Sequence, residues 1–485
     1  MCGICGDWTH DNQEDVHHTL SRRRLLQTGA AVVGAGAVFG ETASALFAQA
    51  PAAPAAGVAQ GPPPTAGSGV PGGLNANARA LSAQRETERQ ATSRTAGARF
   101  QALVRHGNAI TTETVTLKPI HPLQVVIRNQ AVQTCYTGTF QLDTTTRQDQ
   151  ALVTGHGGVG IVADVGSAVK RVRVGDQVIL SATPNCGVCG ECLAGRGDVC
   201  TTRLPSIQTA TMSDNTPVWM TLGPMGPAGH SELLVADEDW VVPIFTKVPP
   251  VEVAMLGCPG GVGLGLTMTR FPVEAGSDVV IFGLGPMGMS IVQGAKIQGA
   301  KTIIGVEPIR YRRELALKLG ATHVLDPNEF TGNNGNDLVA RIRALTPDVV
   351  PAGRRFLGER PAGPLFGFES TAQTQYALAP GIEAPPQGVD VFNQLYTSVR
   401  NGGYVQMAGA VRTSAGMLVG NKVVLSGNFP GIVVLRDLPR FVNLIEKGLF
   451  DAKGLIGRVY RPNQMLEAAQ AAGNRSVISS VIDFT

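Results

Sequence analysis

The chain has 485 residues, enough for two or three domains, and its composition of 43% hydrophobic and 16% charged residues is that of a globular protein. The formal net charge is only +3 and no basic stripe with interleaved aromatic residues occurs, so nothing in the sequence indicates nucleic acid as a partner. The 60 glycines and 31 prolines indicate many turns and some segments without a packed core.

The first 50 residues are typical of an export signal. Residues 21–26 (SRRRLL) resemble a twin-arginine motif, and an apolar stretch of about 12 residues follows, which is too short to span a bilayer. Small residues then end at Ala48-Gln49-Ala50 in an A-x-A cleavage pattern, with Ala43-Ser44-Ala45 as an alternative end. These features predict that the twin-arginine export machinery delivers a periplasmic or exported protein. A basic, alanine-rich tail without an export role is the alternative.

Residues 51–98 begin with proline, alanine and glycine and continue as a polar, arginine-rich stretch, and we expect a disordered linker there. Order is expected to begin at residue 99, because residues 100–107 (FQALVRHG) alternate in the manner of a strand. Short apolar runs at 124–128, 159–164 and 177–181 then lie between glycine, proline and aspartate turns. Residues 99–258 are therefore predicted to be rich in β-structure.

Four cysteines within this stretch form a C-x2-C-x2-C-x7-C run, namely Cys186, Cys189, Cys192 and Cys200. Zinc favours a tetrahedral cage of four sulfurs, and the glycines between these cysteines permit the tight turns that wrapping an ion requires. A complete cage leaves no open coordination position, so we expect a structural zinc rather than a catalytic one. Two disulfides are the alternative, since an exported protein can form them.

From about residue 259 the pattern changes to alternating strands and helices. Strand 278–282 (DVVIF), a glycine-rich turn, a helix and strand 302–306 form a βαβ unit, which strands at 366–370 and 404–408 continue. This succession predicts a doubly wound parallel sheet of the Rossmann type over residues 259–430. The tail, residues 431–485, combines a helix with a closing strand.

The turn after strand 278–282 carries G-x-G-x-x-G as Gly283, Gly285 and Gly288, with Pro286 and Met287 before the last glycine. Between a strand and a helix this pattern predicts a dinucleotide site. The first glycine permits the tight turn, the second lets the backbone approach the pyrophosphate, and the third lets helix and strand pack closely. The N-terminus of the helix then offers unpaired N–H groups to the phosphates.

Glu307 follows strand 302–306, where an acid accepts hydrogen bonds from the ribose hydroxyls and repels a 2′-phosphate. The expected cofactor is therefore NAD rather than NADP. Arg310, Arg312 and Arg313 lie just beyond and offer the opposite possibility, a site for that phosphate, or else they are solvated helix charges. We count Arg312 with Glu307 among the candidate nucleotide-binding residues.

Three further residues stand in separate short motifs: Cys135 in CYTG, His156 in GHGG and Cys258 in GCPGG. Taken singly, each has an ordinary structural explanation as a buried cysteine or a loop histidine. Together with the GDQV turn at 175–178, the four-cysteine lobe, GLGPMG and VEPIRYRR, they follow the order of the zinc-dependent medium-chain alcohol dehydrogenases. Residues 99–485 resemble that family.

The resemblance implies a GroES-like, β-rich catalytic domain over 99–258, a Rossmann NAD-binding domain over 259–430 and a C-terminal segment, 431–485, that returns to the catalytic domain. It implies that Cys135, His156 and Cys258 bind a catalytic zinc, which makes two zinc ions per chain, and that the hydroxyl of Thr137 accepts the alcohol proton. The implied reaction transfers hydride between a small alcohol or aldehyde and NAD(H). The implied assembly is a homodimer or homotetramer.

Three positions depart from the family pattern. Gly157 stands where Glu usually follows the zinc-binding histidine, Phe140 where a relay histidine is often found, and Tyr136 where Arg often follows the first cysteine. These departures keep a second interpretation open, a non-catalytic zinc- and nucleotide-binding protein of the same fold. A zinc-free quinone reductase is disfavoured, because both sets of metal-binding residues are present. Formaldehyde adducts, short alcohols and polyols all stay open as substrates.

Overall fold

The computed structural model describes residues 93–107, 109–135, 151–201, 208–220, 226–330, 336–347, 363–371, 390–407, 420–427 and 431–485. The expected export signal, most of the expected linker, and the positions Tyr136, Thr137 and Phe140 lie outside these ranges.

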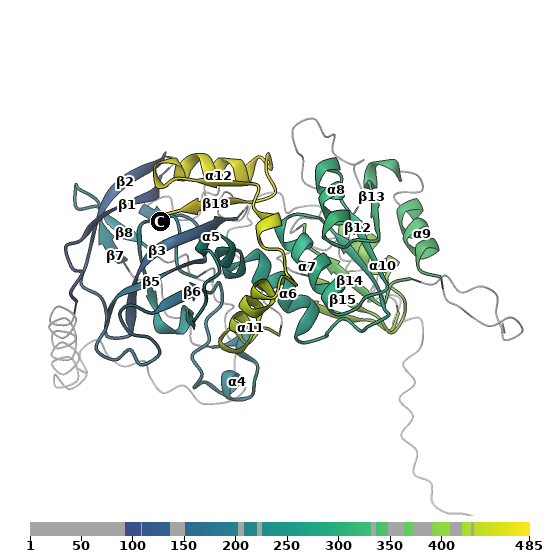
Figure 1. The fold of residues 1–485 in the computed structure, drawn as a ribbon, viewed down its shortest axis with the longest axis horizontal. Helices are drawn as coiled ribbons and strands as arrows, with labels where there is room; N and C mark the ends of the chain where they lie inside the picture. The colour runs from purple at the N-terminus through teal and green to yellow at the C-terminus, as the bar shows by residue number, and fades with distance from the viewer. Residues whose placement is uncertain are drawn as a thin grey trace, which may run out of the picture. The chain divides into compact units, whose positions relative to one another are not determined.

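The N-terminal strands of the described chain close into a small barrel (Figure 1). Its strands, in order around the barrel, are β1 (Arg99–His106), β2 (Ala109–Leu117), β7 (Gln208–Thr211), β8 (Pro217–Trp219) and β4 (Ala151–Val153). Strand β4 pairs with β1 and completes the circle, which leaves no unpaired edge among these strands. Buried valine, leucine and alanine side chains from β1, β2 and β4 fill the interior.

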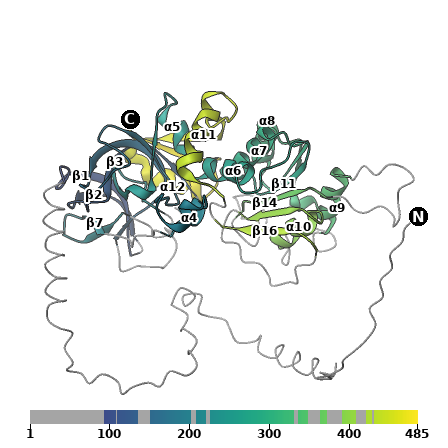
Figure 2. The same ribbon diagram turned by 90° about the horizontal axis from the view of Figure 1, so that it is seen from below.

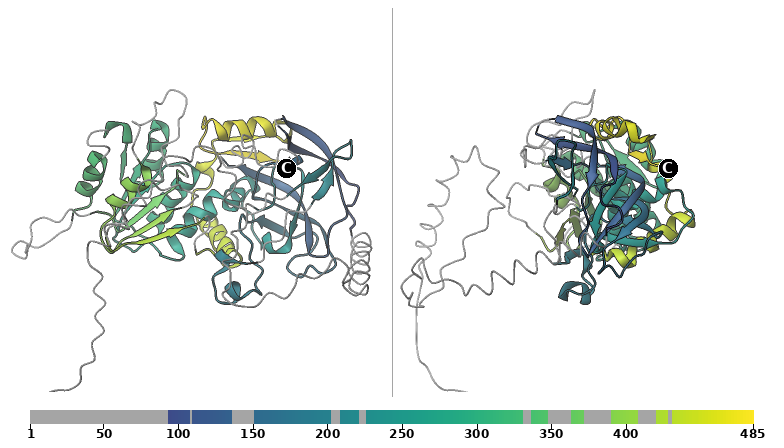
Figure 3. Two further views of the ribbon diagram at one scale, coloured as in Figure 1. Left: turned by 180° about the vertical axis from the view of Figure 1, so that it is seen from behind. Right: turned by 90° about the vertical axis from the view of Figure 1, so that its left-hand side faces the viewer.

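A second sheet packs its apolar residues into the same core and runs in the order β10-β6-β5-β3-β18-β17, with β9 also paired to β3. The strands are β3 (Gln124–Thr134), β5 (Gly158–Val165), β6 (Gln177–Leu180), β9 (Leu233–Asp237), β10 (Val241–Ile244), β17 (Arg458–Tyr460) and β18 (Ser480–Asp483). Strand β18 from the C-terminus pairs antiparallel with β3, and helix α12 (Met465–Gly473) packs beside it (Figure 3). Residues 458–483 thus complete the N-terminal domain.

The third sheet is parallel throughout and runs in the order β13-β12-β11-β14-β15-β16. Its strands are β11 (Asp278–Phe282), β12 (Thr302–Val306), β13 (His323–Leu325), β14 (Phe366–Glu369), β15 (Tyr404–Met407) and β16 (Val423–Ser426). The helices are α7 (Pro286–Ile297), α8 (Arg310–Leu319), α9 (Asn336–Leu345) and α10 (Val391–Ser398). Figure 2 shows α7 and α8 on one side of the sheet and α10 on the other.

Both faces of the central strands of this sheet are buried, as a doubly wound fold requires. Alternate residues of β11 enter different cores: Val279 and Ile281 belong to one apolar cluster, Val280 and Phe282 to the other. The predicted fold class, a GroES-like β-rich domain with a Rossmann doubly wound sheet, is confirmed.

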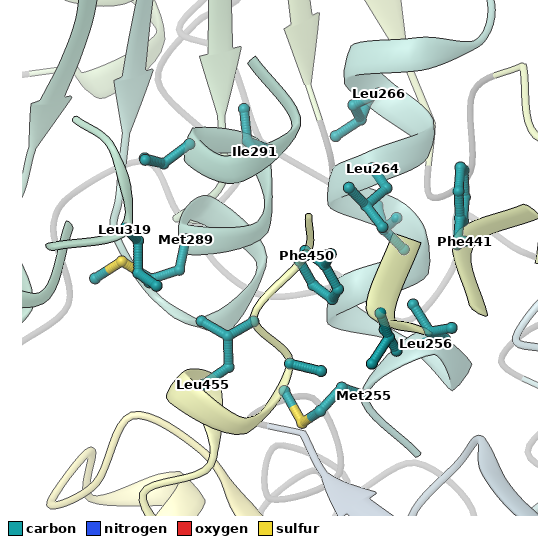
Figure 4. Packing of buried hydrophobic residues seen from close by; sticks show 14 of the residues in the cluster. Met255, Leu256, Leu264, Leu266, Met289, Ile291, Leu319, Phe441, Phe450 and Leu455 are labelled. Carbon is teal, nitrogen blue, oxygen red and sulfur yellow. The ribbon is translucent and has the colours of Figure 1, made fainter. Parts of the chain in front are cut away.

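The larger apolar cluster joins the parallel sheet to the helices around residue 258 (Figure 4). These helices are α5 (Pro250–Val253), η4 (Ala254–Gly257), α6 (Pro259–Met268) and α11 (Val434–Glu446). Helix α6 packs closely on α7, since a Cβ at Gly263 would lie 2.5 Å from Cβ of Ser290. In the described part of the chain no single helix is long and apolar enough to cross a membrane. Only when two helices that meet at a bend, Pro250–Gly257 and Pro259–Met268, are taken together do their length and apolar composition suffice.

Candidate active site and metal centres

The structure brings Cys135, His156 and Cys258 together from three separate elements. Cys135 directly follows β3, His156 lies in the turn between β4 and β5, and Cys258 stands immediately before α6. The Sγ atoms of Cys135 and Cys258 are 3.9 Å apart, and Nε2 of His156 is 3.2 Å from Sγ of Cys258. All three ligand atoms lie within 4.8 Å of one another, so one ion can contact them all.

This donor set fits zinc. Zinc–sulfur and zinc–nitrogen bonds of about 2.3 and 2.1 Å in a tetrahedron place two sulfurs about 3.8 Å apart and a sulfur about 3.6 Å from a nitrogen. The Cys135 thiol and burial both raise the pKa of the Cys258 thiol well above its usual range. A bound cation reverses that preference, because a coordinating thiol is deprotonated. With three protein ligands, the fourth position of a tetrahedral ion would stay open.

Two glycines flank His156 and let its turn pack closely against the residues around it. Gly155 has φ +82°, and a Cβ there would lie 2.5 Å from the ring of His230. Gly157 has φ +71°, and a Cβ there would lie 3.1 Å from the carbonyl oxygen of Gly257. The turn that carries His156 is thus packed directly against the turn that carries Cys258. The structure therefore gives a local reason why Gly157 replaces the glutamate of the family pattern.

The four lobe cysteines form a second cluster, around helices α4 (Gly190–Leu193) and η1 (Gly197–Val199). Sγ of Cys186 is 3.9 Å from Sγ of Cys192, and Sγ of Cys189 is 4.0 Å from Sγ of Cys200. A disulfide needs about 2.05 Å, so these sulfurs are not bonded to each other, contrary to the disulfide alternative. Backbone N–H groups point at the sulfurs, with Cys189 N 3.2 Å from Sγ of Cys186. Four converging sulfurs fit a tetrahedral zinc cage.

The lobe is also tied to a distant part of the chain. The carboxylate of Asp198 in η1 accepts hydrogen bonds from the Arg270 guanidinium at 3.0 Å and from the backbone N–H of Gly431 at 2.8 Å. A Cβ at Gly197 would also lie 3.4 Å from the Val433 side chain. The lobe therefore contacts both the end of α6 and the start of α11.

The glycine-rich turn has the geometry that a dinucleotide phosphate needs. Gly283 has φ +90°, and a Cβ at Gly288 would lie only 2.0 Å from the Gly283 carbonyl oxygen. Gly285 faces open space, with no atom within 4 Å of a Cβ built on it. Pro286 begins α7, whose first turn contains no acidic residue, and Met287 follows it. Unpaired N–H groups at this helix start can bind an anion.

Glu307 lies beside this turn, but its carboxylate is already engaged by the protein. It is buried and accepts hydrogen bonds from the backbone N–H of Leu284 at 2.7 Å and of Ile309 at 3.1 Å. The guanidinium of Arg312, also buried, is 3.9 Å from it. Arg313 pairs with Asp326 at 2.9 Å. Glu307 thus anchors the glycine turn through the backbone of Leu284. Its position in the sequence does not reveal this role.

Comparison with known proteins gives two family matches. Residues 121–246 match the alcohol dehydrogenase GroES-like domain, and residues 286–360 match the zinc-binding dehydrogenase domain. The chain is 27% identical over 372 residues to an alcohol dehydrogenase class-3 from Cereibacter sphaeroides, covering 74% of this chain and 93% of that one. Together these findings support the zinc-dependent medium-chain alcohol dehydrogenase family.

Solved structures agree on the fold. Benzyl alcohol dehydrogenase from Acinetobacter calcoaceticus superposes with a TM-score of 0.63 at 22% identity, covering 80% of this chain and 99% of that one. A zinc-binding dehydrogenase from Sinorhizobium meliloti, bound to NADP, superposes with a TM-score of 0.55 at 20% identity, covering 80% and 100%. At these identities the likeness establishes the dehydrogenase fold, and the family names support an oxidoreductase.

Sequence patterns do not single out one residue that the structure places at the metal centre, His230. It lies in the short turn before β9, is fully buried, and packs against Gly155. Burial and then the neighbouring His156 lower the pKa of His230 to about 3, although Cys135 acts in the opposite direction. Burial therefore favours the neutral form of the His230 ring. A lone histidine without metal-ligand spacing carries no signal, and only the fold brings it here.

Proposed function

We propose that the chain is a zinc-dependent oxidoreductase that transfers hydride between a small alcohol or aldehyde and NAD(H). The observation that supports this most is the convergence of Cys135, His156 and Cys258, in a geometry that leaves one coordination position open. Relatives named as alcohol dehydrogenases, with the same two domains, point to the same class of substrate.

Each chain would hold two zinc ions, one in the centre formed by Cys135, His156 and Cys258 and one in the lobe. Cys135, His156 and Cys258 would hold the ion of the first centre, which would supply Lewis-acid polarisation of the substrate oxygen. The hydroxyl of Thr137 would accept the alcohol proton, as the family resemblance implies. The lobe zinc is structural, because four sulfurs leave no position for a substrate.

NAD is the proposed nucleotide, with its pyrophosphate on the turn of Gly283, Gly285 and Gly288. Glu307 supports this choice, because an acid directly after the second strand of the βαβ unit disfavours a 2′-phosphate on the adenosine ribose. Arg312 favours a 2′-phosphate instead, and the similar dehydrogenase structure from Sinorhizobium meliloti is bound to NADP, so NADP is the alternative nucleotide. The ratio of kcat/KM for NAD and NADP decides between them.

The protein is further proposed to be exported through the twin-arginine route, on the basis of residues 21–26 and the cleavage pattern at 48–50. That route carries folded proteins, so we infer that zinc and nucleotide are bound before export. A homodimer or homotetramer is proposed as the assembly. Strand β16 supports it, because it is the last strand on its side of the sheet among the described strands, and Val423 and Val424 expose apolar side chains there.

The decisive experiment measures zinc and bound nucleotide in protein recovered from the periplasm and then tests short alcohols, polyols and aldehydes for a change in nicotinamide absorbance. Two zinc ions, bound NAD(H) and turnover are the expected results. Zinc-loaded protein that binds NADH but turns over none of these compounds would instead identify a non-catalytic binding protein. Gly157, at the position of the family's glutamate, is the observation that motivates this second candidate.

A further inference from the structure

The turn that carries His230 is held rigidly, which shows that its ring position is built into the fold. The side-chain amide of Asn129 donates to the carbonyls of Gly229 and Ser231, at 3.1 and 2.7 Å. The backbone N–H of His230 donates to the carbonyl of Thr154, two residues before His156, at 2.9 Å. Residues on both sides of His230 are therefore fixed to the core.

His230 nevertheless has one ring nitrogen without a partner. Its Nδ1 lies 2.9 Å from Oγ1 of Thr154, whereas its Nε2 is buried and has no hydrogen-bond partner within the described ranges. A buried polar atom left in this state costs about 1–3 kcal/mol. A nitrogen placed so firmly at that cost is expected to have a partner in the working protein.

His156 also has one ring nitrogen without a hydrogen-bond partner in the described residues. Its Nε2 is the nitrogen that approaches Sγ of Cys258, so Nε2 is the atom that a metal would contact. Its other nitrogen, Nδ1, is buried and has no partner in the described part of the chain. A histidine that binds a metal almost always donates its second N–H to a carboxylate, a carbonyl or a water molecule. Among the residues that the structure describes, no such acceptor is in contact with Nδ1 of His156.

The donor and acceptor directions of the two rings match. Oγ1 of Thr154 lies 3.3 Å from the carbonyl oxygen of Leu103 and can only donate to it. With the hydroxyl hydrogen on Leu103, the same hydroxyl oxygen accepts from Nδ1–H of His230, and this tautomer leaves a lone pair on Nε2. A neutral His156 that binds a metal through Nε2 carries its hydrogen on Nδ1. One orphaned atom is thus an acceptor and the other a donor.

We propose that His230 is the outer partner of His156, and that its Nε2 accepts the Nδ1–H of His156 through one bound water molecule. We invoke a water because, among the described residues, neither nitrogen is in direct hydrogen-bond contact with another group, and one water can bridge two such atoms. Thr154 fixes the tautomer of His230, and His230 in turn orients the imidazole of His156. His230 is therefore a positioning residue. The inference rests on the metal site of the proposed function.

The test compares zinc affinity at the two sites, by competition with a chromophoric chelator, in the whole zinc-loaded protein. His230→Phe keeps the ring volume but removes the acceptor, and it should weaken one zinc about 10–100-fold while the lobe zinc is unchanged. His230→Gln restores an acceptor oxygen and should recover most of that loss. Thr154→Val should weaken the same zinc by a smaller factor. Ser231→Ala, in the same turn, is the matched control and should change neither site.

The proposal is overturned if His230→Phe holds both zinc ions as tightly as the wild type, or if both sites weaken equally, since that would indicate general destabilisation. It is also overturned if His230→Gln is no better than His230→Phe. Should His230→Phe fail to fold, the zinc affinities of Thr154→Val decide: unchanged affinity at both sites, or equal weakening at both, overturns the proposal. Wild-type protein that binds only the lobe zinc would refute the metal site of the proposed function, a result distinct from any variant's behaviour.

Discussion

Replacing Gly157 by alanine is expected to destabilise the catalytic domain and loosen one zinc ion. The φ of +71° at this position costs an L-residue about 1–2 kcal/mol. The added Cβ would also lie 3.1 Å from the carbonyl oxygen of Gly257, which is backbone next to the ligand Cys258. Relief of that contact must move one metal-binding turn away from the other, at a further ~1–3 kcal/mol typical of overpacking. The expected loss is therefore about 2–5 kcal/mol.

Gly175→Ala is the matched control, because Gly175 has φ +97° and no atom within 4 Å of the added Cβ. It should cost only the conformational term of about 1–2 kcal/mol. For a domain of this size each kcal/mol lowers the melting temperature by about 2–4 °C. Calorimetry should therefore find Gly157→Ala less stable than Gly175→Ala, with zinc lost from one site only in the former. Equal melting temperatures and full zinc content in both would refute the reasoning.

Three further predictions concern other parts of the molecule. Burial, and then the charge of Asp239, raise the pKa of Asp237 to about 7, so ionising it in the folded state costs stability as pH rises from about 4 to about 7. The unfolding free energy of Asp237→Asn, relative to that of the wild type, should increase over that range by up to about 4 kcal/mol. A difference in unfolding free energy that is constant with pH would contradict this. Cys192→Ser should release the lobe zinc and lower the melting temperature, while metal analysis still finds the other ion. Glu307→Ala should weaken NAD binding measured by fluorescence titration, because Leu284 N loses its acceptor, and unchanged affinity would argue against this support of the turn.

Local patterns predicted the elements of the nucleotide-binding sheet closely. The strands expected at 278–282 and 302–306 are β11 and β12 with those bounds, since each is a short run of buried residues ended by a glycine turn or a charge. The helix begins at Pro286, within the G-x-G-x-x-G motif rather than after it, because proline is favoured at the first helical position. The pairing of β18 with β3 has no local signal, since its contacts join residues more than 300 positions apart.

For the candidate site, too, the sequence predicted which residues take part but not which residues they contact. Spacing and motif order were enough to nominate Cys135, His156 and Cys258, because each stands in a glycine-containing motif that a family resemblance can recognise. The residues that support the site through hydrogen bonds and packing could not be predicted in this way. Glu307 is bonded to the backbone of Leu284, and His230 packs on Gly155 from a turn 75 residues away in sequence. The first contact depends on the pairing of β11 with β12, and the second on the packing of the turn before β9 against the turn after β4. Both therefore follow from the fold, and no spacing rule contains them.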